Sequence, residues 1–229
     1  IAGMTDEECA RFMKNKKRYG GGWEDALIGG HTLGHYLTAV AQGVINPGLD
    51  QKDRDALEER LNEIVKALAE CQNMTEDTEY EGYLFGAAIV EQDNLDAQFD
   101  HVEAMETNIV TQAWVPWYTM HKILAGLTDA YAIAGNRLAL QVADRLAVWI
   151  SKRANSWSDE LQKTVLATEY GGMNDALYQL YQVTDAPEKE EFLKAAHKFD
   201  EVELFEKVYH YGGNVLNGIH ANTTIPKFL

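Results

Sequence analysis

The sequence predicts an all-α protein built from helical hairpins, either a solenoid or a closed α/α toroid. Apolar residues recur at three- and four-residue steps along six segments, which is the period of amphipathic helices. Turn-forming residues separate these segments in pairs. The four prolines all fall outside the periodic segments. Because a proline in a helix interior costs about 3 kcal/mol, their positions support the expected boundaries.

The expected helices are residues 31–45, 53–71, 119–134, 138–152, 174–183 and 188–199. In the second of these, Leu57, Leu61 and Leu68 share one face, and charged residues occupy the other. The breaks between paired helices are residues 46–48, 135–136 and 185–187. Tyr131 and Tyr181 each stand four residues before such a break, which favours a repeated hairpin.

Residues 73–116 interrupt this rhythm. The stretch is acidic and polar, with one short apolar piece at 83–90. We expect a long connection that contains a short strand pair. Loops of this length are usually functional or mobile.

Composition and charge exclude several classes of protein. The chain has 229 residues, of which 46% are hydrophobic and 24% charged, so it is not disordered, collagen-like or a disulfide scaffold. No apolar run approaches the roughly 20 residues that a membrane span needs. The net charge is −16, whereas surfaces that bind phosphate are usually basic. We therefore expect neither nucleic acid nor a membrane as a partner.

The two cysteines are Cys9 and Cys71. They show no metal-ligand spacing, so the sequence predicts no cysteine-only metal site and no cofactor in this chain; a disulfide between them stays open. The chain begins at Ile1 and ends at Leu229 without the features of natural termini. We therefore expect it to be a fragment of a longer protein.

Clusters of glycine, aromatic and polar residues stand at the starts of the predicted helices. They occupy residues 20–24, 30–36, 114–122, 169–174 and 218–227. In a toroid, alternate helices begin around one opening, so these clusters would converge on one pocket. Aromatic rings beside His, Asn and Glu suit a sugar, because rings stack on its C–H faces while polar groups bind its hydroxyls.

The histidines in these clusters have plainer interpretations as well. His31 and His35 share a helix face, as in the H-E-x-x-H motif of zinc proteases, but Thr32 replaces the glutamate that would act as base. A buried, hydrogen-bonded pair is the favoured alternative for them. His121 by itself is typical of a core histidine with its hydrogen bonds satisfied.

Three further residues have structural alternatives. Glu169 could cap the amides of the helix that follows it. Trp149 lies on an apolar helical stripe and is expected in the core. Trp157 follows a predicted helix end, where we expect it to pack against neighbouring helices.

Taken together, the clusters resemble one family. The strings G-G-W-E, G-H-T-L-G-H-Y-L-T-A, W-V-P-W-Y-T-M-H-K-I-L-A-G-L-T-D-A-Y, E-Y-G-G-M-N and H-A-N-T-T-I-P-K occur in this order. They resemble the catalytic domain of glycoside hydrolase families 127 and 146, the β-L-arabinofuranosidase group, over residues 19–229. The resemblance implies an (α/α)6 toroid, here incomplete, with seven or eight of its twelve helices in a single partial domain, residues 1–229.

The resemblance also implies an activity, the retaining hydrolysis of terminal β-L-arabinofuranosides from plant material. In the family, a cysteine thiolate held on zinc is the nucleophile and a glutamate is the acid/base, and both follow the H-A-N-T-x-I-P-K motif. Neither cysteine matches that position, and Glu169 belongs to a different motif. We therefore expect zinc in the intact family member but no catalytic residue in this chain, which should be inactive by itself.

The sugar-facing motif positions carry over as candidate substrate-binding residues. They are Trp23, Glu24, His31, His35, Trp117, Tyr118, His121, Glu169, Asn174 and His220. The implied partner is a carbohydrate, and an open side of the toroid would allow a homo-oligomer. The family has secreted, periplasmic and cytoplasmic bacterial members, so the resemblance assigns no compartment.

Two other functions stay open. One is a non-catalytic carbohydrate-binding or scaffold relative that kept the pocket. The other is a different α/α-toroid sugar enzyme, an epimerase or a lyase, with His or Tyr as its base.

Overall fold

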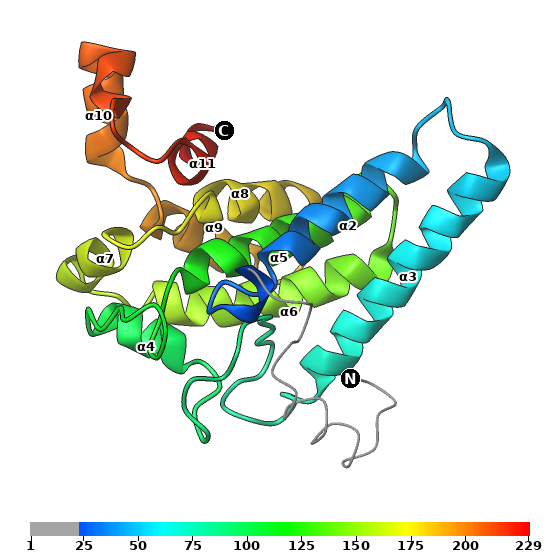
Figure 1. Ribbon diagram of the computed structural model, residues 1–229, viewed down its shortest axis with the longest axis horizontal. Coiled ribbons are helices and arrows are strands. Elements are labelled where there is room, and N and C mark those ends of the chain that lie inside the picture. The colour runs from blue at the N-terminus through cyan, green and yellow to red at the C-terminus, as the bar shows by residue number, and fades with distance from the viewer. Residues whose placement is uncertain (1–22) are drawn as a thin grey trace.

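The computed structural model describes residues 23–229, and this part of the chain is all-helical without any β-strand (Figure 1). Cys9 and the glycines at 20–22 lie outside the described residues. Six longer helices form three hairpins: α2 (His31–Val44) with α3 (Gln51–Asn73), α5 (Pro116–Ala132) with α6 (Arg137–Ala154), and α8 (Met173–Val183) with α9 (Lys189–Lys198). The short elements are η1 (Trp23–Asp25), α4 (Ala97–Glu103), α7 (Asp159–Leu166), α10 (Val202–Tyr211), η2 (Gly213–Leu216), α11 (Ala221–Thr224) and η3 (Ile225–Phe228).

The hairpins stand side by side in two rows. The first row consists of α2, α5 and α8, with α5 packed against both of the others. The second row consists of α3, α6 and α9, with α6 in the middle, and each helix also packs on its hairpin partner. This two-row arrangement of hairpins is the architecture of an α/α toroid and confirms the predicted fold class.

The helices of the first row run parallel, with their N-termini at one end. Gly34 lies against the backbone of Lys122, and one turn later the Thr38 hydroxyl donates to Asp129 at 2.7 Å. At the same end, Gly171, just before α8, touches the ring of His121. The predicted clusters of polar and aromatic residues therefore meet at one end of the molecule.

Two helices of the second row have side-chain caps that the first row lacks, whereas α9, with Glu188 as its N-cap, has none either. In the second row, Asp50 caps α3 by accepting from the Asp53 amide, and Asn136 caps α6 by accepting from the Ala139 amide, each at 2.9 Å. In the first row, the N-cap residues Gly30, Val115 and Gly172 offer no side-chain cap. The amides at these three N-termini are left for other partners, so this end is suited to polar contacts.

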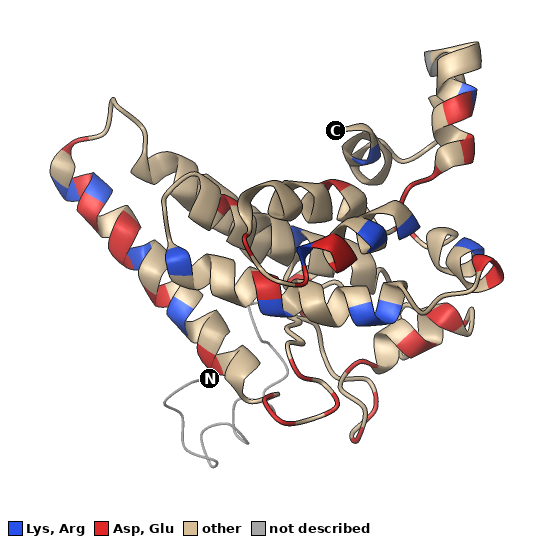
Figure 2. Cartoon of the chain, turned by 180° about the vertical axis from the view of Figure 1, so that it is seen from behind, with Lys and Arg blue, Asp and Glu red and all other residues tan. Residues whose placement is uncertain are grey.

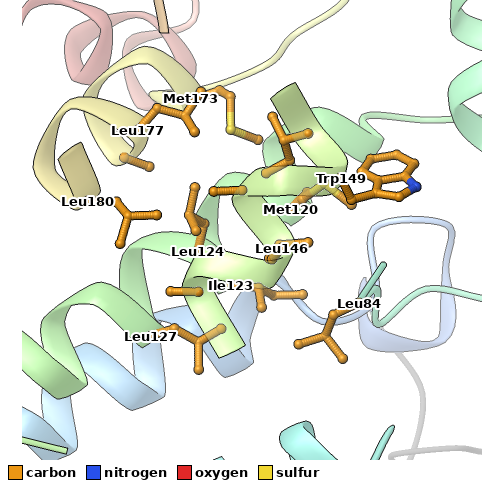
Figure 3. Close-up of a cluster of buried hydrophobic side chains, with 14 of the residues drawn as sticks. Leu84, Met120, Ile123, Leu124, Leu127, Leu146, Trp149, Met173, Leu177 and Leu180 are labelled. Carbon is orange, nitrogen blue, oxygen red and sulfur yellow. The ribbon is translucent and has the colours of Figure 1, made fainter. Parts of the chain in front are cut away.

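The core fills the space between the rows. Figure 3 shows Leu124 and Leu127 of α5 near Leu146 of α6, with Leu177 of α8 on the other side. All four side chains are fully buried. Burial of one such leucine contributes about 1.5–3 kcal/mol, which makes this interface the main stabilising feature of the fold.

A close approach of two glycines fixes α2 on α5. A β-carbon on Gly34 would lie 2.0 Å from the carbonyl oxygen of Lys122, and one on Gly126 would lie 2.5 Å from the carbonyl oxygen of Gly34. Neither contact is possible for a larger residue without moving a helix. The two glycines therefore determine how tightly the first row packs.

A cluster of aromatic rings around Trp117 extends the core toward α4 and α9. The Trp117 ring lies with its centroid 4.7 Å from that of Phe99, 5.1 Å from Phe199 and 5.4 Å from Trp157. Trp149 also joins the cluster, at 6.2 Å. Edge-to-face packing of this kind adds to the energy of burial. The expected packing roles of Trp149 and Trp157 are confirmed.

The connection at 73–116 differs from the prediction. It contains the helix α4 and an isolated bridge between Glu91 and Asn94, so the expected strand pair was wrong. It is also anchored, because Arg153 of α6 binds carboxylates on and beside α4. These belong to Asp96 at 2.9 Å, Glu103 at 2.7 Å and Asp100 at 2.5 Å. The pattern missed α4 because its apolar residues are too few to show a helical period.

The C-terminal part leaves the hairpin body. In Figure 1, α10 projects away from the hairpins, and α11 returns toward α8. None of the α10 residues is buried, and Tyr209 is 85% exposed. In Figure 2, acidic and basic residues follow one another along α3. No helix among residues 23–229 has the length and hydropathy to cross a membrane.

Candidate functional site

We call the end where the first-row helices begin the mouth. Its residues come from η1, from the starts of α2, α5 and α8, and from the C-terminal segment. They are Trp23, Glu24, His31, His35, Trp114, Tyr118, His121, Lys122, Glu169, Gly171, His220 and Asn222. The contacts below connect members from each of the five sequence clusters.

Glu24 holds the start of α2. Its carboxylate accepts from the amide of Gly30 at 2.7 Å and from that of Thr32 at 3.2 Å, so it supplies the cap that Gly30 cannot. The same carboxylate lies 3.1 Å from Nδ1 of His31. Burial raises the pKa of Glu24, but these hydrogen bonds and His31 outweigh it and leave the pKa below its ordinary value.

His31 is oriented by this arrangement. Its Nδ1 lies 2.9 Å from the carbonyl oxygen of Ile28 as well as near Glu24. Its ring lies 6.2 Å from that of Tyr118 on α5. The histidine pair expected on α2 is not a buried pair, because His31 is half-buried and His35 is exposed.

His121 is the most buried polar group of the mouth. It is 4% exposed, and its Nδ1 has no hydrogen-bond partner among the described residues. Its ring stands edge-on to Tyr118 at 5.2 Å. Burial and the nearby Lys122 hold the pKa of His121 well below its ordinary value, so the ring is neutral at neutral pH. The interpretation as a core histidine with its hydrogen bonds satisfied was wrong.

Gly171 makes room for this ring. Its φ is +63°, and a β-carbon there would lie 2.3 Å from Cε1 of His121 and 2.9 Å from the Tyr118 ring. Only glycine combines this backbone conformation with such a close approach. The E-Y-G-G-M-N motif therefore shapes the mouth through a missing side chain.

Lys122 is the one lysine among the mouth residues, which also include the carboxylates of Glu24 and Glu169. The Nζ of Lys122 lies 5.3 Å from the Tyr118 ring centre. Burial lowers the pKa of Lys122, and Asp175 of α8 opposes this shift. Burial, Lys122 and His31 together lower the pKa of His35.

The C-terminal segment closes over the starts of α5 and α8. The Asn222 amide donates to the Tyr118 hydroxyl at 3.0 Å, and Nδ1 of His220 lies 3.0 Å from the Glu169 carboxylate. The Asn174 amide donates to the carbonyl oxygen of Lys227 at 3.0 Å. The H-A-N-T-T-I-P-K motif therefore forms one wall of the mouth. Glu169 pairs with His220, in place of the helix cap that was the alternative for it.

Two tryptophans stack at the rim. The ring centres of Trp23 and Trp114 lie 4.9 Å apart with an interplanar angle of 30°. Trp114 packs on a small apolar cluster formed by Ile28, Val115 and Tyr118. The pair therefore lies beside Tyr118 rather than in the main core.

The structure does not bring every predicted site residue to the mouth. Trp117 is 1% exposed within the aromatic core, so its expected place at the sugar-facing surface was wrong. Asn174 is 3% exposed and ties α8 to Asp200 and to the C-terminal segment. Trp114, Lys122 and Asn222 were not among the predicted site residues. Each lies within a recognised motif. The sequence did not show which residues of α5 point to the mouth, nor that the C-terminal segment folds back onto Tyr118.

The mouth does not fit the zinc–thiolate group that the resemblance implies. No group of three or more His, Cys, Asp or Glu side chains in the described part of the chain is arranged to hold a metal ion. Cys71 is exposed on α3. Residues 23–229 therefore supply no thiolate that could hold zinc at the mouth.

The two hairpin rows and the polar, aromatic mouth at one end define an α/α-toroid domain with a candidate ligand site at that mouth. Comparison with protein families makes this specific. The family described as "Beta-L-arabinofuranosidase, GH127 catalytic domain" matches residues 4–229, and the chain belongs to this family. A search of curated proteins found no match.

Proposed function

We propose that this domain binds the terminal β-L-arabinofuranosyl residue of a plant-derived glycan in the mouth and serves a glycoside hydrolase that releases it. The family membership supports a glycosidase of this type. The observation that carries the proposal is the buried Nδ1 of His121, which has no partner among the described residues and belongs to a ring held between Tyr118 and Gly171. A buried polar atom without a partner is costly unless a ligand supplies one.

The chemistry of the mouth suits a neutral sugar. A neutral imidazole offers one donor and one acceptor, which matches a hydroxyl group, itself both donor and acceptor. His31 is half-buried and provides a ring face for C–H groups, and Lys122 adds a charged donor. The Tyr118 ring is buried and supports them from behind. His121, Tyr118 and Lys122 would bind and orient the sugar, and Gly171 leaves the room for them.

We further propose that residues 1–229 form a partial toroid that supplies sugar binding but no turnover. Retaining hydrolysis needs a nucleophile and an acid/base on opposite sides of the glycosidic bond. The carboxylate of Glu24 is engaged with the start of α2, and that of Glu169 with His220. No thiol of the described residues lies at the mouth. We therefore expect no release of nitrophenol from 4-nitrophenyl β-L-arabinofuranoside, and measurable turnover would contradict this part.

Calorimetric titration tests the binding. We expect the chain to bind methyl β-L-arabinofuranoside and to discriminate against methyl β-D-glucopyranoside. The Tyr118 hydroxyl accepts from Asn222 and keeps its own proton to donate to the sugar, so Tyr118→Phe should weaken binding by about fivefold, since one hydrogen bond contributes about 1 kcal/mol. Tyr181→Phe is the matched control, because that hydroxyl faces Glu190 between α8 and α9. Equal loss in both variants, or no binding by the native chain, would contradict the proposal.

A second candidate is a carbohydrate-binding relative without catalysis. The absence of a thiolate site from the described residues is the observation that favours it. Titration with a methyl glucuronide separates the third class, since an epimerase or lyase that acts on uronates should prefer that ligand to the arabinofuranoside.

A further inference from the structure

The stacked pair Trp23 and Trp114 lies at the rim of the mouth, outside the residues proposed to bind the terminal sugar. The chain has five tryptophans, and the structure describes all of them. Trp117, Trp149 and Trp157 are buried in the aromatic core. Trp23 differs, with 63% of its surface exposed and its ring stacked on the half-buried Trp114. A single exposed apolar residue is ordinary, but two stacked indoles beside the mouth form a flat apolar surface that a ligand can cover.

The pair is held in a defined place. Trp114 packs on the cluster of Ile28, Val115 and Tyr118, which connects it directly to the mouth. Trp23 begins η1, and its neighbour Glu24 is bonded to the amides at the start of α2. The platform is therefore fixed relative to the mouth, through the packing of Trp114 on Tyr118 and the contacts of Glu24 at the start of α2.

Its chemistry points to a carbohydrate ring. The indoles offer a flat apolar face, and the half-buried ring of His31 supplies a polar group in the same mouth. A flat face with polar groups at its edge is what a sugar ring requires, because its C–H face is apolar and its rim carries hydroxyls.

We propose that Trp23 and Trp114 bind the second sugar of the substrate, the one to which the terminal arabinofuranose is bonded. This inference rests on the proposed function, since it assigns the terminal sugar to the mouth. The platform would make the domain prefer a disaccharide to a monosaccharide, by about fivefold to tenfold for stacking on an aromatic ring.

The test compares two ligands by calorimetry: methyl β-L-arabinofuranoside and the methyl glycoside of a β-L-arabinofuranosyl disaccharide. In the native chain the disaccharide should bind about fivefold to tenfold more tightly. Trp23→Ala should bring this ratio close to one, and Trp23→Phe should keep part of it. Tyr209→Ala removes an aromatic ring that is more exposed and lies on α10, so the ratio should stay as in the native chain.

The outcomes separate the two proposals. If the native chain binds the monosaccharide with no preference for the disaccharide, or if Trp23→Ala keeps the native ratio, the platform is wrong and the proposed function stands. If the native chain binds neither ligand, the proposed function fails and the platform with it. Trp114→Ala removes the inner ring and should also bring the ratio of the two affinities close to one. Circular dichroism verifies that this variant is folded.

Discussion

Two aromatic regions lie close together in this molecule, and they differ in burial and polarity. The core around Trp117 is closed, with rings packed edge-to-face and nearly no exposed surface. The mouth around Tyr118 is polar, with a neutral buried histidine and an exposed tryptophan at its rim. One sequence motif, residues 114–122, supplies both regions. Residue type alone therefore does not distinguish a packing aromatic from one that binds a ligand.

The helical phase of α5 makes the distinction. Consecutive residues on an α-helix point about 100° apart, so Trp117 turns toward Phe99 and Phe199 while Tyr118 turns toward Asn222 and His121. Which side faces the core is decided by the hairpins that pack on α5. The packing of Trp117 in the core therefore fixes the rotation of α5, and this rotation places Tyr118 and His121 at the mouth.

The largest effect should come from the core side of the motif. Trp117→Ala removes a fully buried indole from the centre of the aromatic cluster and should lower the free energy of unfolding by about 3–5 kcal/mol. Tyr118→Phe, one residue later, should cost about 1 kcal/mol because it loses only the hydrogen bond from Asn222. Urea unfolding of both variants measures the difference. Equal losses would break the comparison between the two regions.

A smaller loss is expected where the mouth depends on a missing side chain. Gly171→Ala should lower the free energy of unfolding by about 2–3 kcal/mol, since the new methyl group meets His121 at a positive φ. Gly135→Ala is the matched control, because Gly135 also has a positive φ but nothing lies within 4 Å of its added carbon. It should cost about 1 kcal/mol, from backbone strain alone. Similar losses in both would show that the contact with His121 is unimportant.

The buried histidine should make stability depend on pH. Its folded pKa lies well below the ordinary value of 6.5, so the unfolded chain binds a proton first as the pH falls. Stability should therefore decrease below about pH 6.5, by about 1 kcal/mol per pH unit until the folded pKa is reached. His121→Gln should flatten this dependence, measured as urea midpoints between about pH 7.5 and about pH 5.5. Met120→Leu, a buried neighbour that does not titrate, should keep the native slope.

The smallest expected effect is at the start of α2. Glu24→Gln keeps the shape of the cap but removes its charge, and should cost about 0.5–1 kcal/mol at neutral pH. Because the folded pKa of Glu24 is lowered, its contribution is present above the ordinary value of 4.5 and is lost as the pH falls through the folded pKa. The variant and the native chain should therefore converge in strong acid. A constant gap at all pH values would contradict the role of the charge.

The long helices could be predicted from the sequence, and the short ones could not. Residues 53–71 carry an unbroken apolar stripe, and α3 was found there. By contrast, α4, α7 and α10 were not predicted. Helices α4 and α7 have seven and eight residues, too few for a repeated period, and α10 is amphipathic but buries none of its residues. The segment that holds α4 was expected to contain strands. It is helical because Arg153 and the ring of Phe99 tie it to α6 and the core.

The candidate site could be predicted as a set of motifs, but not residue by residue. Glycine and polar residues at helix starts indicated the mouth, because the N-termini of parallel helices meet at one end of a toroid. Trp117 was misplaced because the phase of α5 depends on its neighbours. Asn222 became visible only when the C-terminal segment was seen to return to Tyr118, a contact across 104 residues.

The central claim is that the mouth, and no other part of the surface, binds an arabinofuranoside. Titration of the isotope-labelled chain with methyl β-L-arabinofuranoside, followed by NMR chemical shifts, tests it most directly. We expect chemical-shift changes at Tyr118, His121 and His220. A groove between α3 and α6 is lined by Asn73, Leu138 and Arg145, and we expect no changes there. Shifts confined to that groove, or no shifts at all, would contradict it.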